Sequence, residues 1–276
     1  MLNISLEALS AMFGNFLIDQ FGVLLDGTKA YPGAAQALME LSNRGKRIVI
    51  LSNSGKRSVP NELRLEQMGF DRDHFDSVVT SGEVARTLLA KRVGHDIPAG
   101  GKVFVISRDE DLSCIEGLDL SASGKPEESD LILISGSRGD EIALDSYETL
   151  LAGAARNGVP ALCCNPDMTM LSRHGSAFGA GRIAGLYCKL GGNVEMIGKP
   201  YPQIYSAALD RLGHPELRDV VCIGDSPMHD IRGAHGAGIS AVLVLTGLSS
   251  GINPGEENPV LEKSDCPDYV MKKFRF

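Results

Sequence analysis

Short apolar runs that alternate with helical patterns constrain the fold of this chain more than any other sequence feature. Glycine and proline separate the elements: the helix expected at 34–44 begins after Pro32-Gly33 and ends at Gly45. This rhythm predicts an α/β protein with a parallel sheet covered by helices on both faces. Ligands of such a sheet bind at the carboxyl ends of its strands. The strands are expected at residues 16–19, 47–52, 77–80, 194–197, 220–223 and 241–245.

A second, smaller alternation occupies the middle of the chain. Strands are expected at 102–107, 131–134 and 160–164, and helices at 82–90 and 146–156. A helix at 182–190 then leads back to the first pattern. We therefore predict an α/β core formed by residues 1–81 and 180–276, with a smaller α/β module inserted at residues 82–179.

The composition narrows the classes of function. A chain of 276 residues suits one large or two modest domains. The net charge of −8 argues against nonspecific binding to nucleic acid or to an anionic membrane. Any anionic substrate then needs a local positive centre, such as a metal ion or a lysine. Residues 1–13 lack the basic region of a signal peptide, and no apolar stretch is long enough to cross a bilayer.

The six cysteines show no CxxC pair and no spacing typical of zinc ligands. Several lie inside apolar runs, so we expect small core residues and not a disulfide framework. This usage is typical of a reducing compartment and predicts a cytoplasmic protein.

Acidic residues follow two of the predicted strands. Asp19 ends the run Phe16–Asp19, where a carboxylate can attack phosphorus and form an aspartyl phosphate. Asp225 follows the strand 220–223, and Asp230 lies five residues later. Two acids around a strand-to-helix turn can hold one hard cation, and magnesium prefers such oxygen ligands. The alternatives are a solvated turn acid at Asp19 and helix N-caps at Asp225 and Asp230.

Ser52 and Lys199 also lie at strand ends. The Ser52 hydroxyl and the backbone N–H groups that follow, in Asn53 and Ser54, can hold phosphate oxygens. Lys199 can offset the charge of a nucleophile and of a transferring phosphoryl group. The alternatives are a capping or turn serine and an exposed loop lysine.

The order Asp19, Ser52, Lys199 and Asp225 with Asp230 resembles the four motifs of the haloacid dehalogenase (HAD) phosphatase superfamily. The module inserted between the serine and lysine motifs resembles subfamily IIA, which includes nitrophenyl- and pyridoxal-phosphate phosphatases. Further matches are Gly22-Val23-Leu24 with Asp26-Gly27, Pro32-Gly33-Ala34, Leu51-Ser52-Asn53-Ser54, Asn165-Pro166-Asp167, Gly179-Ala180-Gly181, Gly198-Lys199-Pro200 and Gly224-Asp225.

The resemblance implies a Rossmann-like three-layer α/β/α core, a mobile cap of the C2 type and magnesium-dependent hydrolysis of phosphomonoesters. Magnesium would be bound by Asp19, by the backbone carbonyl of Phe21 and by Asp225, with Asp230 acting through water or orienting Lys199. Proteins of this branch often pair through their caps, which makes a homodimer an expectation here. The cap residues expected to face substrate are Asn165, Asp167 and His174.

Phe21 departs from the family pattern, which has a second aspartate at this position. That aspartate protonates the leaving alcohol and later activates water, and such help contributes typically 10²–10⁴-fold. Phenylalanine cannot transfer protons, although its carbonyl can still bind a metal. Asp26 or a cap residue are the candidate substitutes. We therefore expect a phosphate site that survives with slower turnover.

Three functions follow, in order of preference. The first is a magnesium-dependent phosphatase of small phosphorylated metabolites, and the second is a non-catalytic phosphometabolite-binding or regulatory protein on the same scaffold. The third is a dinucleotide enzyme, because residues 179–184 match the pattern GxGxxA. The nearest expected strand, 160–164, lies too far upstream for the tight turn that this fingerprint needs.

Overall fold

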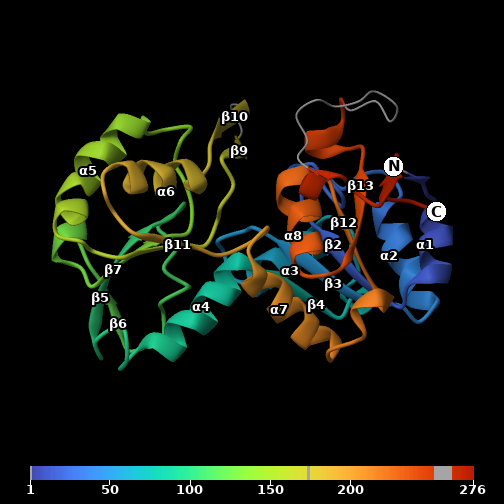
Figure 1. Ribbon diagram of the computed structural model, residues 1–276, viewed down its shortest axis with the longest axis horizontal. Coiled ribbons are helices and arrows are strands. Elements are labelled where there is room, and N and C mark those ends of the chain that lie inside the picture. Colours follow the sequence, from blue (N-terminus) through green and yellow to red (C-terminus); the bar gives the residue numbers. More distant parts are fainter. Residues whose placement is uncertain (1, 173–174, 252–262) are drawn as a thin grey trace. The chain divides into compact units, whose positions relative to one another are not determined.

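The computed structural model describes residues 2–172, 175–251 and 263–276 and divides into two compact units (Figure 1). The first unit consists of Met1–Ser52, Val59–Val79 and Lys199–Phe276. The second unit consists of Asn53–Ser58 and Thr80–Gly198. Each unit has its own sheet.

A seven-stranded sheet forms the centre of the first unit, in the order β1-β14-β13-β12-β2-β3-β4. The ladders described between β1 and β3 are all parallel. All five residues of β2 are buried, as expected for a central strand covered on both faces. The strands are β1 Leu2–Asn3, β2 Asn15–Asp19, β3 Arg47–Ser52, β4 Ser77–Thr80, β12 Val220–Gly224, β13 Ser240–Val244 and β14 Tyr269–Met271.

Helices cover both faces of this sheet, which makes three layers. Side chains of α1, α2 and α3 share one apolar core with Phe16 and Ile18 of β2. Figure 1 shows α1 and α2 on one side of the strands and α8 on the other. Because side chains alternate along a strand, Leu17 and Asp19 face away from this core. The helices are α1 Leu6–Met12, α2 Ala34–Asn43, α3 Ser58–Gln67, α7 Pro202–Leu212 and α8 Arg232–Gly236.

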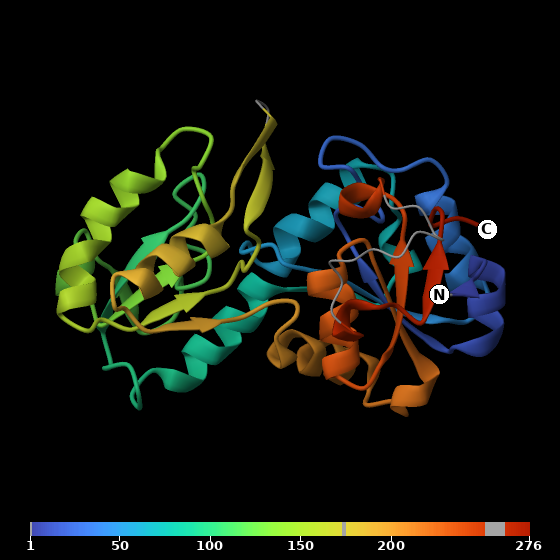
Figure 2. The same ribbon diagram turned by 45° about the horizontal axis from the view of Figure 1, so that its top comes forward.

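The second unit contains a five-stranded sheet in the order β11-β8-β7-β5-β6, with parallel ladders throughout. Helices α5 and α6 cover one face and α4 the other (Figure 2). An antiparallel hairpin, β9 with β10, precedes α6. The bounds are α4 Ser81–Arg92, β5 Gly101–Ile106, β6 Leu120–Ala122, β7 Leu131–Ile134, α5 Leu144–Arg156, β8 Ala161–Cys163, β9 Thr169–Ser172, β10 Gly175–Phe178, α6 Ala180–Lys189 and β11 Val194–Met196.

The α/β class predicted from the sequence is confirmed, and the predicted strands lie within one or two residues of the observed ones. Short strands without an apolar run were not predicted, namely β1, β6, β9, β10 and β14. The sequence also predicts a helix at 230–237, and α8 lies within these bounds. A π-helical turn, Pro227–Ile231, precedes α8, because the chain begins its turn at Ser226-Pro227 and carries Asp230 inside the first turn.

The observed units differ in extent from the predicted ranges 1–81, 82–179 and 180–276. Residues 180–198 group with the second unit, because β11 pairs with β8 and α6 packs on the same sheet. Residues 53–58 group there too. The role of this unit as a C2-type cap stays a prediction.

The cysteines and the lengths of the helices test two further predictions. All six cysteines are free, but Cys188 and Cys266 are exposed and so are not core residues as expected. Both lie near element ends, where an apolar neighbourhood in sequence does not ensure burial. Within the described residues, no helix has the length and apolar character needed to cross a membrane.

Asp219 joins the beginnings of the two central strands. Its carboxylate accepts hydrogen bonds from the Gly14 backbone N–H at 2.7 Å and from the Asn15 amide at 2.9 Å. We expect Asp219→Ala to lower the free energy of unfolding by about 1–3 kcal/mol, because partly buried donors lose their acceptor. Urea denaturation measures this, with the exposed Glu216→Ala as the control expected to change stability by less than about 0.5 kcal/mol. Equal stability of the two variants would contradict the assignment.

Candidate functional site

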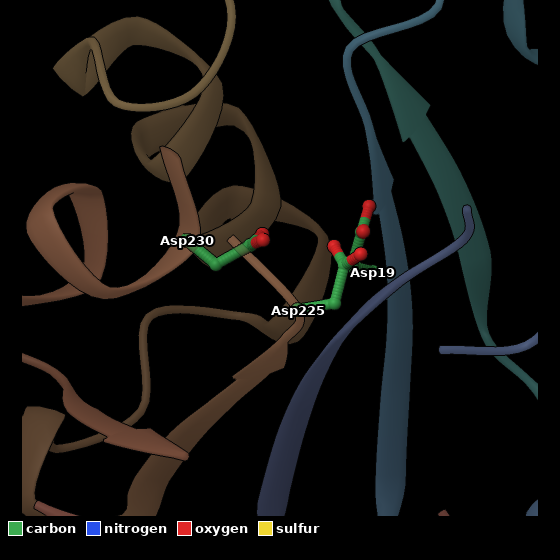
Figure 3. A group of neighbouring side chains, drawn as sticks. All are labelled: Asp19, Asp225 and Asp230. Carbon is green, nitrogen blue, oxygen red and sulfur yellow. The ribbon is translucent and has the colours of Figure 1, made fainter. Parts of the chain in front are cut away.

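Three carboxylates meet at the carboxyl edge of the first-unit sheet. Strand β12 pairs in parallel with β2 up to Ile223 and Ile18, so Asp19 ends one strand beside the residues that lead to Asp225. Ligand oxygens of Asp19, Asp225 and Asp230 all lie within 4.8 Å of one another. Figure 3 shows the Asp19 and Asp225 carboxylates together, with Asp230 pointing toward them. The structure therefore brings together the three acids that the sequence analysis selected.

Lys199 bridges two of these acids. Its Nζ lies 2.5 Å from Asp19 Oδ1 and 2.7 Å from Asp230 Oδ1. The lysine side chain is only 3% exposed, so the exposed loop lysine considered as an alternative is excluded. Charge-assisted hydrogen bonds of this kind fix the positions of both carboxylates.

Two glycines provide the space that the acids occupy. Gly22 has a φ of 93°, a conformation that favours glycine, and a Cβ there would overlap the Asp225 carboxylate. A Cβ on Gly224 would overlap the Asp230 carboxyl group. These positions must stay small if Asp225 and Asp230 are to lie against the backbone of β2 and β12.

A loop after β13, residues 246–249, holds Asp225 and the chain that follows Asp19. The Leu248 backbone N–H donates to Asp225 Oδ2 at 2.6 Å, and the buried Ser249 hydroxyl donates to the Asp225 carbonyl at 2.6 Å. The Thr246 hydroxyl donates to the Gly22 carbonyl at 2.5 Å. This loop was not predicted as part of the site; its place after a predicted strand is visible in the sequence, but its hydrogen bonds are not.

Asp230 is held from two sides. The Ser226 backbone N–H donates to Asp230 Oδ2 at 3.1 Å, and the Tyr205 hydroxyl donates to the Asp230 carbonyl at 3.3 Å. The residue that caps the turn is Ser226, whose hydroxyl accepts from the His229 N–H. The alternative interpretation of Asp225 or Asp230 as the N-cap is therefore wrong.

Burial and neighbouring negative charge raise the pKa values of Asp19 and Asp225 in this cluster. Burial is the largest cause for Asp19, whose pKa is raised well above 3.8 even though Lys199 opposes the shift. Burial and the charge of Asp230 raise the pKa of Asp225 to about 7. Burial alone would lower the pKa of Lys199, but Asp19 and Asp230 outweigh it and raise that pKa. Perturbed groups of this kind mark functional sites.

The remaining predicted residues have different surroundings. Ser52 is buried at the end of β3, and Asn53 and Ser54 follow it in the second unit. The Asn53 amide donates to Asp167 Oδ1 at 2.8 Å, and the Asp167 N–H donates to Asn165 Oδ1 at 3.2 Å. These three residues therefore form a network within the second unit, which the Ser81 hydroxyl joins by donating to Asn53 Oδ1 at 3.4 Å. His174 lies outside the described residues.

The surroundings of Phe21 and Asp26 bear on proton transfer at the site. The Phe21 ring is partly buried against the apolar core, and the Arg64 guanidinium lies 5.7 Å from the ring centre. Asp26 Oδ1 accepts hydrogen bonds from the Thr28 N–H at 2.9 Å, the Thr28 hydroxyl at 2.8 Å and the Lys29 N–H at 3.0 Å. These hydrogen bonds, the backbone ones first, lower the pKa of Asp26.

The GxGxxA match at 179–184 has a structural explanation. A strand does precede Gly179, contrary to the sequence analysis, but it is β10 of an antiparallel hairpin and not the parallel strand of a dinucleotide-binding unit. A Cβ on Gly179 would overlap the Asp167 carbonyl, and one on Gly181 would overlap the Pro166 carbonyl. The two glycines serve close backbone packing, which disfavours the dinucleotide alternative.

Known proteins resemble this chain along most of its length. A family described as haloacid dehalogenase-like hydrolase matches residues 16–121, and a HAD-hydrolase-like family matches residues 196–275. The acid sugar phosphatase of Staphylococcus epidermidis is 30% identical over 237 residues, covering 85% of this chain and 87% of that protein. The chain belongs to the haloacid dehalogenase-like hydrolase family. Mouse chronophin is 26% identical over 246 residues, covering 85% of this chain and 81% of chronophin.

Solved structures support the same assignment. The p-nitrophenyl phosphatase from Archaeoglobus fulgidus has a TM-score of 0.75 and 26% identity, covering 95% of this chain and 97% of that one. A glycerol phosphate phosphatase from Mycobacterium tuberculosis, solved with magnesium, has a TM-score of 0.76 and 24% identity, covering 96% and 77%. The family and the fold predicted from the motifs are both confirmed.

The raised pKa of Asp225 predicts how the stability of the metal-free protein depends on pH. Asp225 has a pKa of about 7 in the folded state against an ordinary value of 3.8, so between these values the unfolded state binds fewer protons. Stability should therefore fall as the pH rises from about 4 to about 7, by an amount on the order of a few kcal/mol.

Thermal unfolding in a chelator, at a series of pH values, measures this dependence. Asp225→Asn keeps an acceptor for the Leu248 N–H but removes the titration, so its melting temperature should exceed that of the wild type at pH 8 and match it more closely at pH 4. Asp210→Asn, at an exposed position, is the control. Parallel curves for wild type and Asp225→Asn would contradict the prediction.

Proposed function

We propose that this chain is a magnesium-dependent phosphatase of small phosphorylated metabolites. The observation that carries the proposal is the buried contact between Lys199 and Asp19 at the end of β2, beside Asp225. A carboxylate held at the edge of a parallel sheet, where ligands bind, is placed to act as a nucleophile. The relatives named sugar phosphatase and p-nitrophenyl phosphatase support the same reaction class.

The donor set fits magnesium. Magnesium takes oxygen ligands at about 2.0–2.1 Å in an octahedron and keeps several waters. The oxygens of Asp19, Asp225 and Asp230 lie within 4.8 Å of one another and carry more negative charge than Lys199 balances. Asp19, the Phe21 carbonyl and Asp225 would bind the ion directly, and Asp230 through water. When bound, the ion would neutralise charge on the phosphoryl oxygens.

The proposed reaction has two steps. An Asp19 oxygen attacks phosphorus, the bond to the leaving group breaks, and an aspartyl phosphate forms. Water then attacks that phosphorus, and Asp19 regains its carboxylate while phosphate leaves. Lys199 stabilises the transferring group, together with the Ser52 hydroxyl, Asn53 and Ser54.

The second unit would act as the cap. In this proposal Asn165 and Asp167 contact the substrate, and closure excludes water until the leaving group has departed. A homodimer formed through this unit and a cytoplasmic location, which the six free cysteines support, belong to the same proposal.

Phe21 favours a second candidate, a phosphometabolite-binding protein without turnover. The ring occupies the position where the family has its proton-transferring aspartate. Calorimetry would then show binding of a phosphorylated metabolite with no release of phosphate, whereas sustained turnover excludes this candidate.

Hydrolysis of p-nitrophenyl phosphate with magnesium tests the main proposal. Asp19→Asn should lower the rate by on the order of 10³-fold or more, because the amide cannot form the aspartyl phosphate. A chelator should abolish the activity and added magnesium should restore it. Asp210→Asn on the surface of α7 is the matched control and should keep the wild-type rate. Release that is unchanged in Asp19→Asn, or absent in the wild type, would reject a phosphatase.

We also expect the loop at residues 246–249 to support magnesium binding through Asp225. Ser249→Ala removes the hydrogen bond to the Asp225 carbonyl and should weaken magnesium binding several-fold, with a loss of stability of about 1–2 kcal/mol. Magnesium titration by calorimetry and urea denaturation measure the two effects. The exposed neighbour Ser250→Ala should change neither. Wild-type values for Ser249→Ala in both measurements would show that the loop does not support Asp225.

A further inference from the structure

We propose that this site is suited to phosphoryl compounds whose leaving group departs as a stable anion, such as aryl phosphates, acyl phosphates and phosphoanhydrides. Esters of simple alcohols, such as glycerol phosphate, would be poor substrates. The inference rests on the proposed phosphatase activity and names its substrate class. It comes from the side chains that follow the Asp19 nucleophile.

The chain after Asp19 provides no proton donor up to Asp26. Gln20 is fully buried, with an amide that has no hydrogen-bond partner among the described residues, and an amide does not act as an acid at neutral pH. Phe21 places a carbon ring against the apolar core, beneath the guanidinium of Arg64. A guanidinium keeps its protons at every relevant pH. Gly22 and the apolar run Val23-Leu24-Leu25 follow.

Asp26 does not replace the missing acid. One of its oxygens accepts three hydrogen bonds within its own turn, and these lower its pKa. An aspartate with a lowered pKa is ionised at neutral pH and has no proton to donate. Among the described residues of the first unit, the acids that lie with Asp19 are Asp225 and Asp230, which the proposed function uses for the metal ion and for Lys199.

Without an acid, the leaving oxygen must depart with its electron pair and no proton. In the first step the Asp19–phosphorus bond forms, and the electron pair of the broken phosphorus–oxygen bond stays on the leaving oxygen. Phosphoryl transfer has a loose transition state, so much of this charge is already present there. A leaving group whose conjugate acid is itself acidic tolerates the charge, whereas an alkoxide does not. A general acid contributes typically 10²–10⁴-fold, and only poor leaving groups need it.

In the second step, the family's second aspartate would act as the base that activates water, and Phe21 cannot take this role. Water must attack the aspartyl phosphate while losing its proton to solvent, so hydrolysis of the intermediate becomes slow relative to its formation from a good leaving group. The aspartyl phosphate should then accumulate, and product release should begin with a burst close to one equivalent per site.

A series of aryl phosphates of graded leaving-group acidity tests the inference, together with acetyl phosphate and glycerol phosphate. In wild type, single-turnover rates should rise steeply with leaving-group acidity, and kcat/KM for glycerol phosphate should lie about 10²–10⁴-fold below that for p-nitrophenyl phosphate. A shallow dependence, or glycerol phosphate hydrolysed as fast as p-nitrophenyl phosphate, would overturn the inference. Complete inactivity, or activity unchanged in Asp19→Asn, would instead reject the proposed function.

Substitution at position 21 sharpens the test. Phe21→Asp should raise kcat/KM for glycerol phosphate by about 10²-fold or more while changing that for p-nitrophenyl phosphate by less than about tenfold. Asparagine has nearly the same shape as aspartate but transfers no proton, so Phe21→Asn should not raise kcat/KM for glycerol phosphate. An equal gain in both variants would overturn the inference. If Phe21→Asp fails to fold, as circular dichroism would show, the wild-type series decides alone.

Two side chains of the same unit serve as a check on the assignment, Tyr31 in a loop and His229 in the π-helical turn. Tyr31 receives a hydrogen bond from the Gly247 backbone, and burial raises the pKa of its hydroxyl. His229 lies next to Asp230. Tyr31→Phe and His229→Gln should leave the dependence on leaving-group acidity unchanged. A variant in which this dependence becomes steeper would identify a proton donor and overturn the inference.

Discussion

A buried excess of negative charge is the constraint on which the rest of this structure depends. Three carboxylates lie within reach of one cation, and a single buried ammonium group balances them only in part. Burying charge is costly, so the protein surrounds the acids with backbone N–H groups at Ser226 and Leu248. Burial, together with the remaining charge imbalance, raises the pKa values of Asp19 and Asp225. The imbalance makes the site a strong candidate for a divalent cation.

The fold brings these charged side chains together at the carboxyl edge of the first-unit sheet. Parallel pairing brings the ends of β2 and β12 together, and Lys199, just before α7, contacts Asp19 at the end of β2. The loop at residues 246–249 then joins Asp225 to the turn after Asp19. Side chains alternate along β2: Phe16 and Ile18 face the apolar core, and Asp19, on the opposite side, belongs to the acid cluster. The same strand therefore contributes to stability and to the site.

Much of this site could be predicted from strand ends. Asp19, Ser52 and Asp225 end or follow strands of one parallel sheet, and the carboxyl ends of such strands meet at one edge. Lys199 follows β11 of the other sheet, so this rule does not predict its contact with Asp19. The support by Thr246 and Ser249 could not be predicted, because a hydroxyl that donates to a backbone carbonyl needs no particular residue at the partner position. The π-helical turn at Pro227–Ile231 was not predicted either; within it, Asp230 contacts Lys199 and Ser226.

The amino-acid order by itself determined two things about this protein. It placed oxygen and ammonium groups at the ends of buried strands, and it put phenylalanine where a proton-transferring aspartate would stand. Only the tertiary structure decided that Lys199 pairs with Asp19 and Asp230, that Asn53 pairs with Asp167, and that the pKa of Asp225 rises to about 7. Side-chain chemistry is a property of each residue, whereas pairing and burial arise from tertiary contacts between distant segments, such as Asp19 and Lys199, which lie 180 residues apart.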